Sequence, residues 1–265
     1  MKLTSKNYFT AKNNHISNSD KNNYKKCKNY FYRKKVLRDL PFKVLADVLI
    51  TGSAVDEWLT KSEASFRKKY KVTNRSKTED QETYRYKLTQ GMYNEIVGMC
   101  KSVEASEAYK LIKKEKHKSQ KILQWDFPIN EYFDGICNIP DWYIIDKKTG
   151  ICTITDLKTA KAFGGSKIKW HYKCLDYNYY TQQAMAQKIL KHDHPEIKFF
   201  QSRHLIVEKD PDGIHNVYAW IISQDRIDDA MIELNETLED IHNEINFNKL
   251  PASWSDDDVV GEYEE

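Results

Sequence analysis

Residues 139–159 read IPDWYIIDKKTGICTITDLKT, two runs of β-branched and aromatic residues on either side of a polar segment. Such runs around a turn that contains Gly predict a β-hairpin. If the segment KKTG forms the loop, Asp146 pairs with Ile151. The same register then places Asp141 opposite Asp156, with their Cβ atoms about 5 Å apart. Two carboxylates this close repel each other unless a cation lies between them, so the hairpin predicts a cation site.

Lys158 joins the two acids on one face of this hairpin. Side chains alternate along a strand, so Lys158 points to the side of Asp156 while Leu157 points into the packing. Metal-assisted phosphodiester hydrolysis needs such a set, because hard oxygen ligands hold Mg²⁺ or Mn²⁺ and an ammonium acts beside the attacking water. Asp141 and Asp156 would hold the ion, the backbone carbonyl of Leu157 could add a ligand, and Lys158 would orient or help deprotonate the water. The alternative is that two surface acids and a lysine decorate a solvated hairpin.

The rest of the chain predicts helices around this sheet. Apolar residues at helical spacing indicate two helices within 36–70 that meet at a turn at Thr51-Gly52-Ser53, further helix over 88–112, a helix over 178–190 and a long C-terminal helix. Short β-branched and aromatic runs predict strands at 122–127, 132–138, 141–146, 151–157, 199–208 and 214–222, the last two forming a hairpin at DPDG, residues 210–213.

Composition excludes several classes of protein. The 265 residues are 40% hydrophobic and 31% charged with 9 Gly and 6 Pro, which excludes collagen-like, low-complexity and membrane proteins. The N-terminal segment lacks the apolar core of a signal peptide, so a cytoplasmic protein is expected. Five cysteines without a CxxC pair indicate neither a disulfide framework nor a zinc knuckle.

Charge is distributed unevenly. Residues 1–35 hold ten Lys and Arg against one acid, whereas residues 224–265 hold two bases against fourteen acids. A basic segment interleaved with aromatic residues suits a polyanion, and a solvated basic arm is the equal alternative. The acidic end is predicted to be disordered.

The pair Pro140-Asp141 followed by Asp156-Leu157-Lys158 resembles the PD-(D/E)xK signature of the restriction-endonuclease-like nucleases. The resemblance is closest to phage-type, RecB/RecE-like and lambda-exonuclease-like exonucleases, and it spans roughly residues 16–190. It includes further motifs in the same order: ISNS at 16–19 with YKKC at 24–27, TGSAVDE at 51–57, and YYTQQAMA at 179–186.

The resemblance implies an α/β (α+β) fold, a restriction-endonuclease-like core in which helices flank a central mixed β-sheet after a helical N-terminal region. It implies a single nuclease domain over 1–250, with a helical part at 16–115, the catalytic sheet and helix at 120–222, a C-terminal helix at 224–247, and an acidic tail at 251–265.

The resemblance also implies supporting residues. Asp56 stands where many relatives place a metal-binding His, and is expected to be a ligand. Tyr179 and Gln182 are expected to support the site, with Gln183 as the alternative by a one-residue slip. Relatives often carry a Glu where this chain has Gln120, and Glu131 could substitute for it.

The segment 161–173 lies beside the predicted site and is expected to bind nucleic acid. Its lysines would contact phosphates, and Phe163, Trp170 or Tyr172 would stack on a base. The alternative is a flexible solvated loop. The expected contacts are Lys161, Lys167, Lys169, Trp170 and Lys173.

Together these observations predict a Mg²⁺-dependent DNA nuclease in which Mn²⁺ substitutes, an exonuclease at duplex ends in phage-type recombination or repair. The alternatives are a structure-specific or nonspecific endonuclease and a catalytically silent nucleic-acid-binding module. Some relatives bind an iron–sulfur cluster; Cys27 matches its early ligand, but no cysteine follows Cys174, so no cluster is expected. No membrane association is expected, and a homo-oligomer and a single-strand annealing protein partner are compatible with the resemblance.

Overall fold

The main sheet of the protein has five strands in the part of the chain that the structure, a computed structural model, describes: residues 2–4, 6–8, 10, 13–40, 45–115, 117–210 and 212–244. β8 and β9 pair in parallel and the other neighbours are antiparallel, so the sheet is mixed. Its strand order is β10 (Val217–Ile222), β9 (Phe199–Lys209), β8 (Ile151–Lys161), β7 (Trp142–Asp146) and β4 (Lys118–Ser119).

Smaller sheets accompany it, whereas the sequence predicts a single central sheet. One has the order β1 (His15–Ile16), β6 (Gly135–Asn138) and β5 (Leu123–Asp126), and another pairs β2 (Lys71–Val72) with β3 (Lys87–Leu88). The separation of β5 and β6 from the main sheet is not visible in the sequence, because strand patterns do not show which strands pair.

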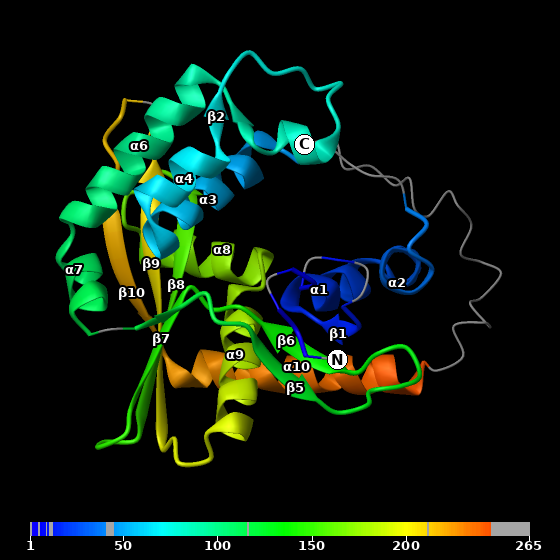
Figure 1. Ribbon diagram of the computed structural model, residues 1–265. Coiled ribbons are helices and arrows are strands. Elements are labelled where there is room, and N and C mark those ends of the chain that lie inside the picture. The colour runs from blue at the N-terminus through cyan, green and yellow to red at the C-terminus, as the bar shows by residue number, and fades with distance from the viewer. Residues whose placement is uncertain are drawn as a thin grey trace.

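Helices of the N-terminal half cover one face of the main sheet (Figure 1). Their apolar side chains share a core with Trp142, Leu157, Leu205 and Val207 of the strands. These helices are α3 (Asp47–Asp56), the π-helical turn η2 (Glu57–Lys61), α4 (Glu63–Lys69), α5 (Gln81–Tyr84), α6 (Gln90–Ala105) and α7 (Glu107–Lys114).

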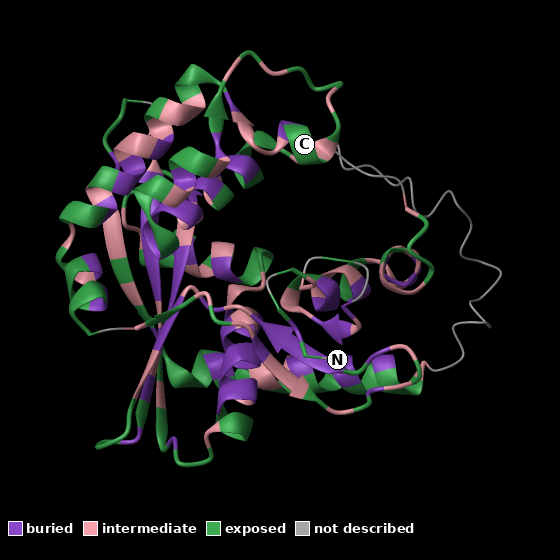
Figure 2. Cartoon of the chain, viewed as in Figure 1, coloured by how far each residue is buried: buried purple, intermediate pink, exposed green. Residues whose placement is uncertain are grey.

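The opposite face packs on helices that follow β8. Ala160 and Ile206 of the sheet contact α8 (Lys167–Asp176), α9 (Tyr179–Asp193) and α10 (Gln224–Asn243). α9 also packs against the smaller sheet, beside the N-terminal elements α1 (Asn18–Lys26), α2 (Lys28–Tyr32) and the π-helical turn η1 (Arg33–Leu37). Buried residues accordingly concentrate on β8, β9 and the inner side of α9 (Figure 2).

The predicted fold class is confirmed, since helices flank a mixed sheet after a largely helical N-terminal region. No helix in the described ranges is long and apolar enough to span a membrane. The acidic tail at 251–265 and the end of the helix predicted at 224–247 lie outside the described residues.

One local prediction is wrong. α3 runs unbroken through Thr51-Gly52-Ser53, and the chain turns instead at Ser62, whose hydroxyl caps α4 by accepting from the N–H of Ser65. A single Gly does not end a helix whose neighbouring residues favour it. The alternative of a flexible loop over 161–173 holds only for its first part, because α8 begins at Lys167.

Candidate active site

The β7–β8 hairpin has the register that the sequence predicts. Asp146 pairs with Ile151, and the ladder continues to Trp142 opposite Thr155. Asp141 comes directly before β7, and its Oδ2 accepts a hydrogen bond of 2.6 Å from the backbone N–H of Leu157. The acid before one strand is therefore fixed against the other strand, beside Asp156.

Asp156, Lys158 and Gln182 form a closed set of contacts. Lys158 makes an ion pair with Asp156, whose side chain is only 3% exposed. Gln182 on α9 donates to Asp156 Oδ1 over 3.1 Å and accepts from Lys158 Nζ over 2.9 Å. Lys158 Nζ also lies 4.2 Å from the centre of the Tyr179 ring. The structure thus brings Gln182 and Tyr179 to the acid–lysine pair, whereas Gln183 is buried and its Oε1 has no hydrogen-bond partner among the described residues.

Asp56 reaches the same place from α3 on the other side of the hairpin. At Gly52, one turn earlier, an added Cβ would lie 3.3 Å from Thr159 Oγ1, so the missing side chain lets α3 approach β8 closely. Residues four apart share a helix face, so this contact also directs Asp56 towards the sheet. Its Oδ2 accepts a hydrogen bond of 2.5 Å from Gln120 Nε2, and its carboxyl lies beside that of Asp141.

Electrostatics at this point favour an added positive charge. Burial raises the pKa of Asp56 to about 6, and the charges of Asp156 and Glu57 add to the increase. Burial, with the charges of Asp56 and Asp156, likewise raises the pKa of Asp141 well above its usual range. Burial opposes the charge of Lys158, but Asp156 and the neighbouring groups outweigh it and raise its pKa. Neighbouring carboxylates repel each other when both are charged, and a cation between them would relieve that repulsion.

The donor chemistry fits a hard divalent cation. Asp56, Asp141 and Asp156 supply carboxylate oxygens, which Mg²⁺ prefers, and the buried Asp56 Oδ1 has no hydrogen-bond partner in the described part of the chain. Within the described residues, no group of three or more His, Cys, Asp or Glu side chains is placed so that it could hold a metal ion. Leu157 offers its backbone at this point, and a role for its carbonyl stays a prediction.

His204 is a neighbour that the sequence analysis missed. It pairs with Asp156 in the parallel β8–β9 register and is fully buried. Burial, helped by the charge of Lys158, lowers its pKa well below the usual range, so the imidazole is neutral. Its ring packs edge-on against Trp170 and Tyr179. A single His within an apolar strand gives no sequence signal of this position.

The predicted nucleic-acid contacts divide into two groups. Lys161, Lys167 and Lys169 are exposed and Lys173 is half-buried, so these lysines remain candidates. Trp170 is wrong as a stacking residue, because it is only 1% exposed and packs on Phe163 and Tyr179. Trp170 and Cys174 are the buried residues of α8, and their spacing of four residues is typical of the core-facing side of a helix.

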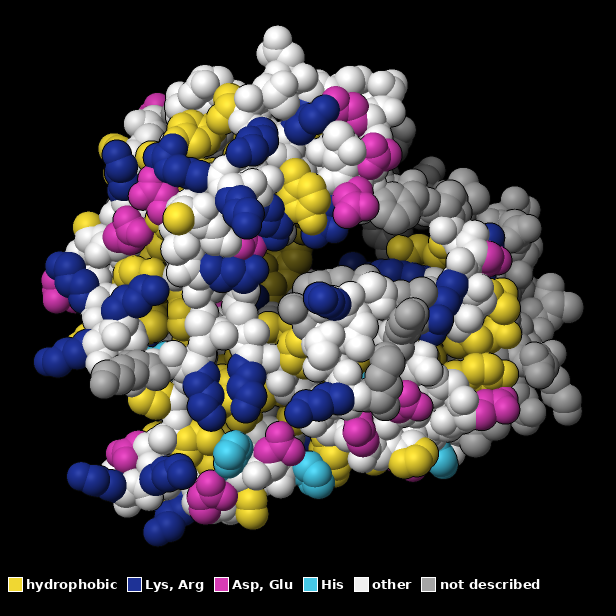
Figure 3. Space-filling view, in the orientation of Figure 1, with side chains coloured by type: hydrophobic (Ala, Val, Ile, Leu, Met, Phe, Trp, Pro, Cys, Tyr) yellow, Lys and Arg dark blue, Asp and Glu magenta, His cyan; other side chains and the backbone are white. Residues whose placement is uncertain are grey.

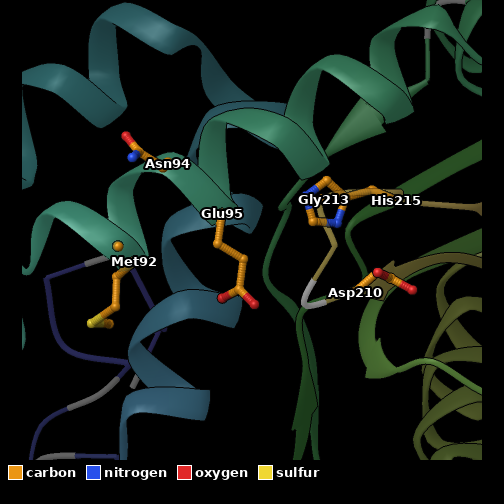
Figure 4. Close-up of a pocket in the computed structure, with 7 residues that line it drawn as sticks. Met92, Asn94, Glu95, Asp210, Gly213 and His215 are labelled. Carbon is orange, nitrogen blue, oxygen red and sulfur yellow. The ribbon is translucent and has the colours of Figure 1, made fainter.

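Lys and Arg side chains are spread over the face shown in Figure 3, which is hollowed beside the helices around α3. A separate pocket of about 460 Å³ lies between α6 and the β9–β10 hairpin, lined by Gly91, Met92, Asn94, Glu95, Asp210, Gly213 and His215 (Figure 4). Its lining includes none of the site acids. Glu131, the alternative acid, is exposed in the connection between β5 and β6.

The chain resembles a solved structure in its fold, but not a known family in its sequence. No family model matches the chain, and no curated protein matches it. The crystal structure of a "putative exonuclease" from Eubacterium rectale superposes with a TM-score of 0.66 at 15% identity, over 100% of this chain and 95% of that one. At this identity the likeness concerns the fold, so the chain shares its overall fold with that protein.

Proposed function

We propose that this protein is a metal-dependent DNA nuclease that hydrolyses phosphodiester bonds. The observation that carries the proposal is the contact set of Asp156, Lys158 and Gln182, beside which the Leu157 N–H fixes Asp141. Carboxylates beside an ordered ammonium provide ligands for a metal and a cation for the scissile phosphate. The shared fold with the exonuclease-named structure from Eubacterium rectale supports this assignment.

Each side chain has a role in the proposed reaction. Asp141, Asp156 and Asp56 would hold Mg²⁺, with Mn²⁺ as a substitute and the Leu157 carbonyl as a further ligand. The bound ion would supply a Lewis acid for the phosphate and lower the pKa of a bound water. Lys158 would orient the attacking water and offset charge that develops on the phosphate, while Gln182 and Tyr179 keep its ammonium in place.

An exonuclease that acts on duplex ends is the preferred form of this activity. This preference rests on the order of the motifs over residues 16–190. It is supported by the similar fold of the Eubacterium rectale structure, whose name describes an exonuclease. By the same resemblance, the reaction belongs to phage-type recombination or repair, where a single-strand annealing protein would be a natural partner.

The test is a time course on end-labelled linear duplex and on covalently closed circular DNA, each with Mg²⁺, Mn²⁺ or EDTA. Wild type and Lys158→Ala are compared. Metal-dependent loss of linear DNA with circles spared is expected, and the label released first gives the polarity. Nicking of circles would replace the exonuclease with an endonuclease. No metal-dependent cleavage by wild type would overturn the proposal in favour of a silent binding module.

A further inference from the structure

An exposed tyrosine stands next to the candidate site without a role in the contacts described so far. Tyr177, directly after α8, is 60% exposed. Its ring stacks on Tyr179, with centroids 5.6 Å apart and planes inclined by 19°. The ring of Tyr179 in turn lies 4.2 Å from Lys158 Nζ. A continuous series of contacts therefore runs from the proposed reaction centre to an exposed aromatic ring.

The backbone creates this arrangement. Residues two apart in a helix do not face each other, so Tyr177 and Tyr179 could not stack if α8 continued into α9. Asn178 between them adopts the left-handed conformation with φ +55°, which ends one helix and begins the next. Asn is among the few non-Gly residues that tolerate this conformation. The turn thus holds the Tyr177 ring parallel to Tyr179 with much of its surface in solvent.

Positively charged side chains lie along α8 on the approach to the Tyr177 ring. Lys169 and Lys173 precede Tyr177 by two turns and one turn on the same side of the helix, a span of about 12 Å. Lys169 is exposed and Lys173 half-buried. Lysines along a path that ends in an exposed ring match single-stranded nucleic acid, which presents phosphates to the cations and a base face to the ring.

We propose that Tyr177 stacks on an unpaired base of the nucleotide next to the scissile phosphate, so that the reacting strand end is bound single-stranded. This rests on the proposed nuclease function and specifies its substrate. The terminal pair of a duplex leaves only its outer face free, whereas an unpaired base can also present its inner face to a ring. In this proposal the strand end separates from its complement before the phosphate reaches Lys158.

The test measures stacking directly, with 2-aminopurine at the terminal position of oligonucleotides, placed at either end in separate molecules. Binding is followed in EDTA, where cleavage is prevented. Wild type is expected to quench the fluorescence of a single-stranded or frayed end. Tyr177→Ala should abolish the quench and weaken binding about 5- to 100-fold, the range for one base–aromatic stack. Tyr177→Phe should restore both.

Tyr172→Ala is the matched control, because Tyr172 is also 60% exposed but its described ring contact is with His171 rather than Tyr179. Equal quenching by wild type and Tyr177→Ala, or equal loss in Tyr172→Ala, would overturn the stacking proposal. Cleavage of the same oligonucleotides with Mg²⁺ is measured in parallel. Normal cleavage without a Tyr177-dependent quench overturns the stacking alone, whereas neither cleavage nor binding by wild type overturns the proposed function as well.

Discussion

Oδ2 of Asp141 accepts a 2.6 Å hydrogen bond from the backbone N–H of Leu157. The bond closes the β7–β8 hairpin one residue beyond its last ladder pair and leaves the other carboxyl oxygen of Asp141 for the neighbouring acids. It fixes the acid without a second side chain. The geometry of the candidate site is therefore set in part by the strand backbone, which substitutions of nearby side chains leave in place.

Replacing Lys158 by Ala should reduce DNA cleavage at least about 100-fold, because the ammonium beside the phosphate would be lost. DNA affinity should change little, since phosphate contacts are distributed over many lysines. Cleavage rates and filter binding measure the two effects. Lys147→Ala in the exposed hairpin loop is the control and should behave as wild type. Full activity of Lys158→Ala would contradict the assigned role.

Asp141→Asn should stabilise the metal-free protein, because it removes one of the carboxyl groups that raise each other's pKa. Asn still offers an oxygen to the Leu157 N–H. We expect the midpoint of thermal unfolding in EDTA to rise by about 2–4 °C for each kcal/mol by which the free energy of unfolding increases. Mg²⁺ should raise the midpoint of wild type but no longer that of the variant, because ligand binding to the folded state is lost.

The control for that experiment is Asp146→Asn at the far end of the hairpin, where the carboxylate accepts from the Thr149 hydroxyl. This variant should keep the Mg²⁺-dependent rise. If Asp141→Asn kept the same rise as wild type, Asp141 would not be a ligand.

Gly52→Leu should destabilise the protein by about 1–3 kcal/mol and lower its activity, because the new side chain would meet Thr159 and force α3 away from β8. Asp56 would move with the helix. Urea unfolding and cleavage assays give both quantities. Gly91→Leu is the control, since a Cβ there meets only Thr89 Oγ1 at 4.0 Å. Equal effects at the two glycines would show that close helix–strand contact is not the cause.

Stability at low pH should depend on Glu208. Burial opposes its charge, but hydrogen bonds from Asn216, Phe163 N–H and Gly164 N–H outweigh this and lower its pKa. A carboxyl with a lowered folded-state pKa stabilises the protein above its unfolded pKa of about 4.3, and this stabilisation is lost as pH falls through the folded-state value.

Glu208→Gln should therefore cost about 1–2 kcal/mol at pH 7 and flatten the loss of stability below pH 4. Urea midpoints between pH 2 and 7 measure both effects. Glu239→Gln, at an exposed position of α10, is the comparison and should leave stability at pH 7 nearly unchanged. If the Glu208→Gln variant lost stability with falling pH as steeply as wild type, this carboxylate would not be the source of the pH dependence.

The hairpin was predictable because strand alternation and a loop containing Gly fix a register without any distant information. Gln182 and Tyr179 could be placed only through motif resemblance, since nothing local in α9 shows which residues reach β8. Trp170 was misassigned because an aromatic between lysines has the same pattern whether it faces solvent or core. His204 and the continuation of α3 through Gly52 depend on tertiary packing, which a single sequence does not contain.

The parallel pairing of β8 with β9 has a consequence for folding. α8 and α9 both lie between β8 and β9 in the sequence. Pairing of the two strands therefore closes a long loop, which costs conformational entropy before the strand contacts are gained. Asp156 and Lys158 sit on β8, while Gln182 arrives from the intervening α9. The contacts of Gln182 with Asp156 and Lys158 therefore require this intervening loop to pack against β8, and a complete local hairpin is not sufficient for them.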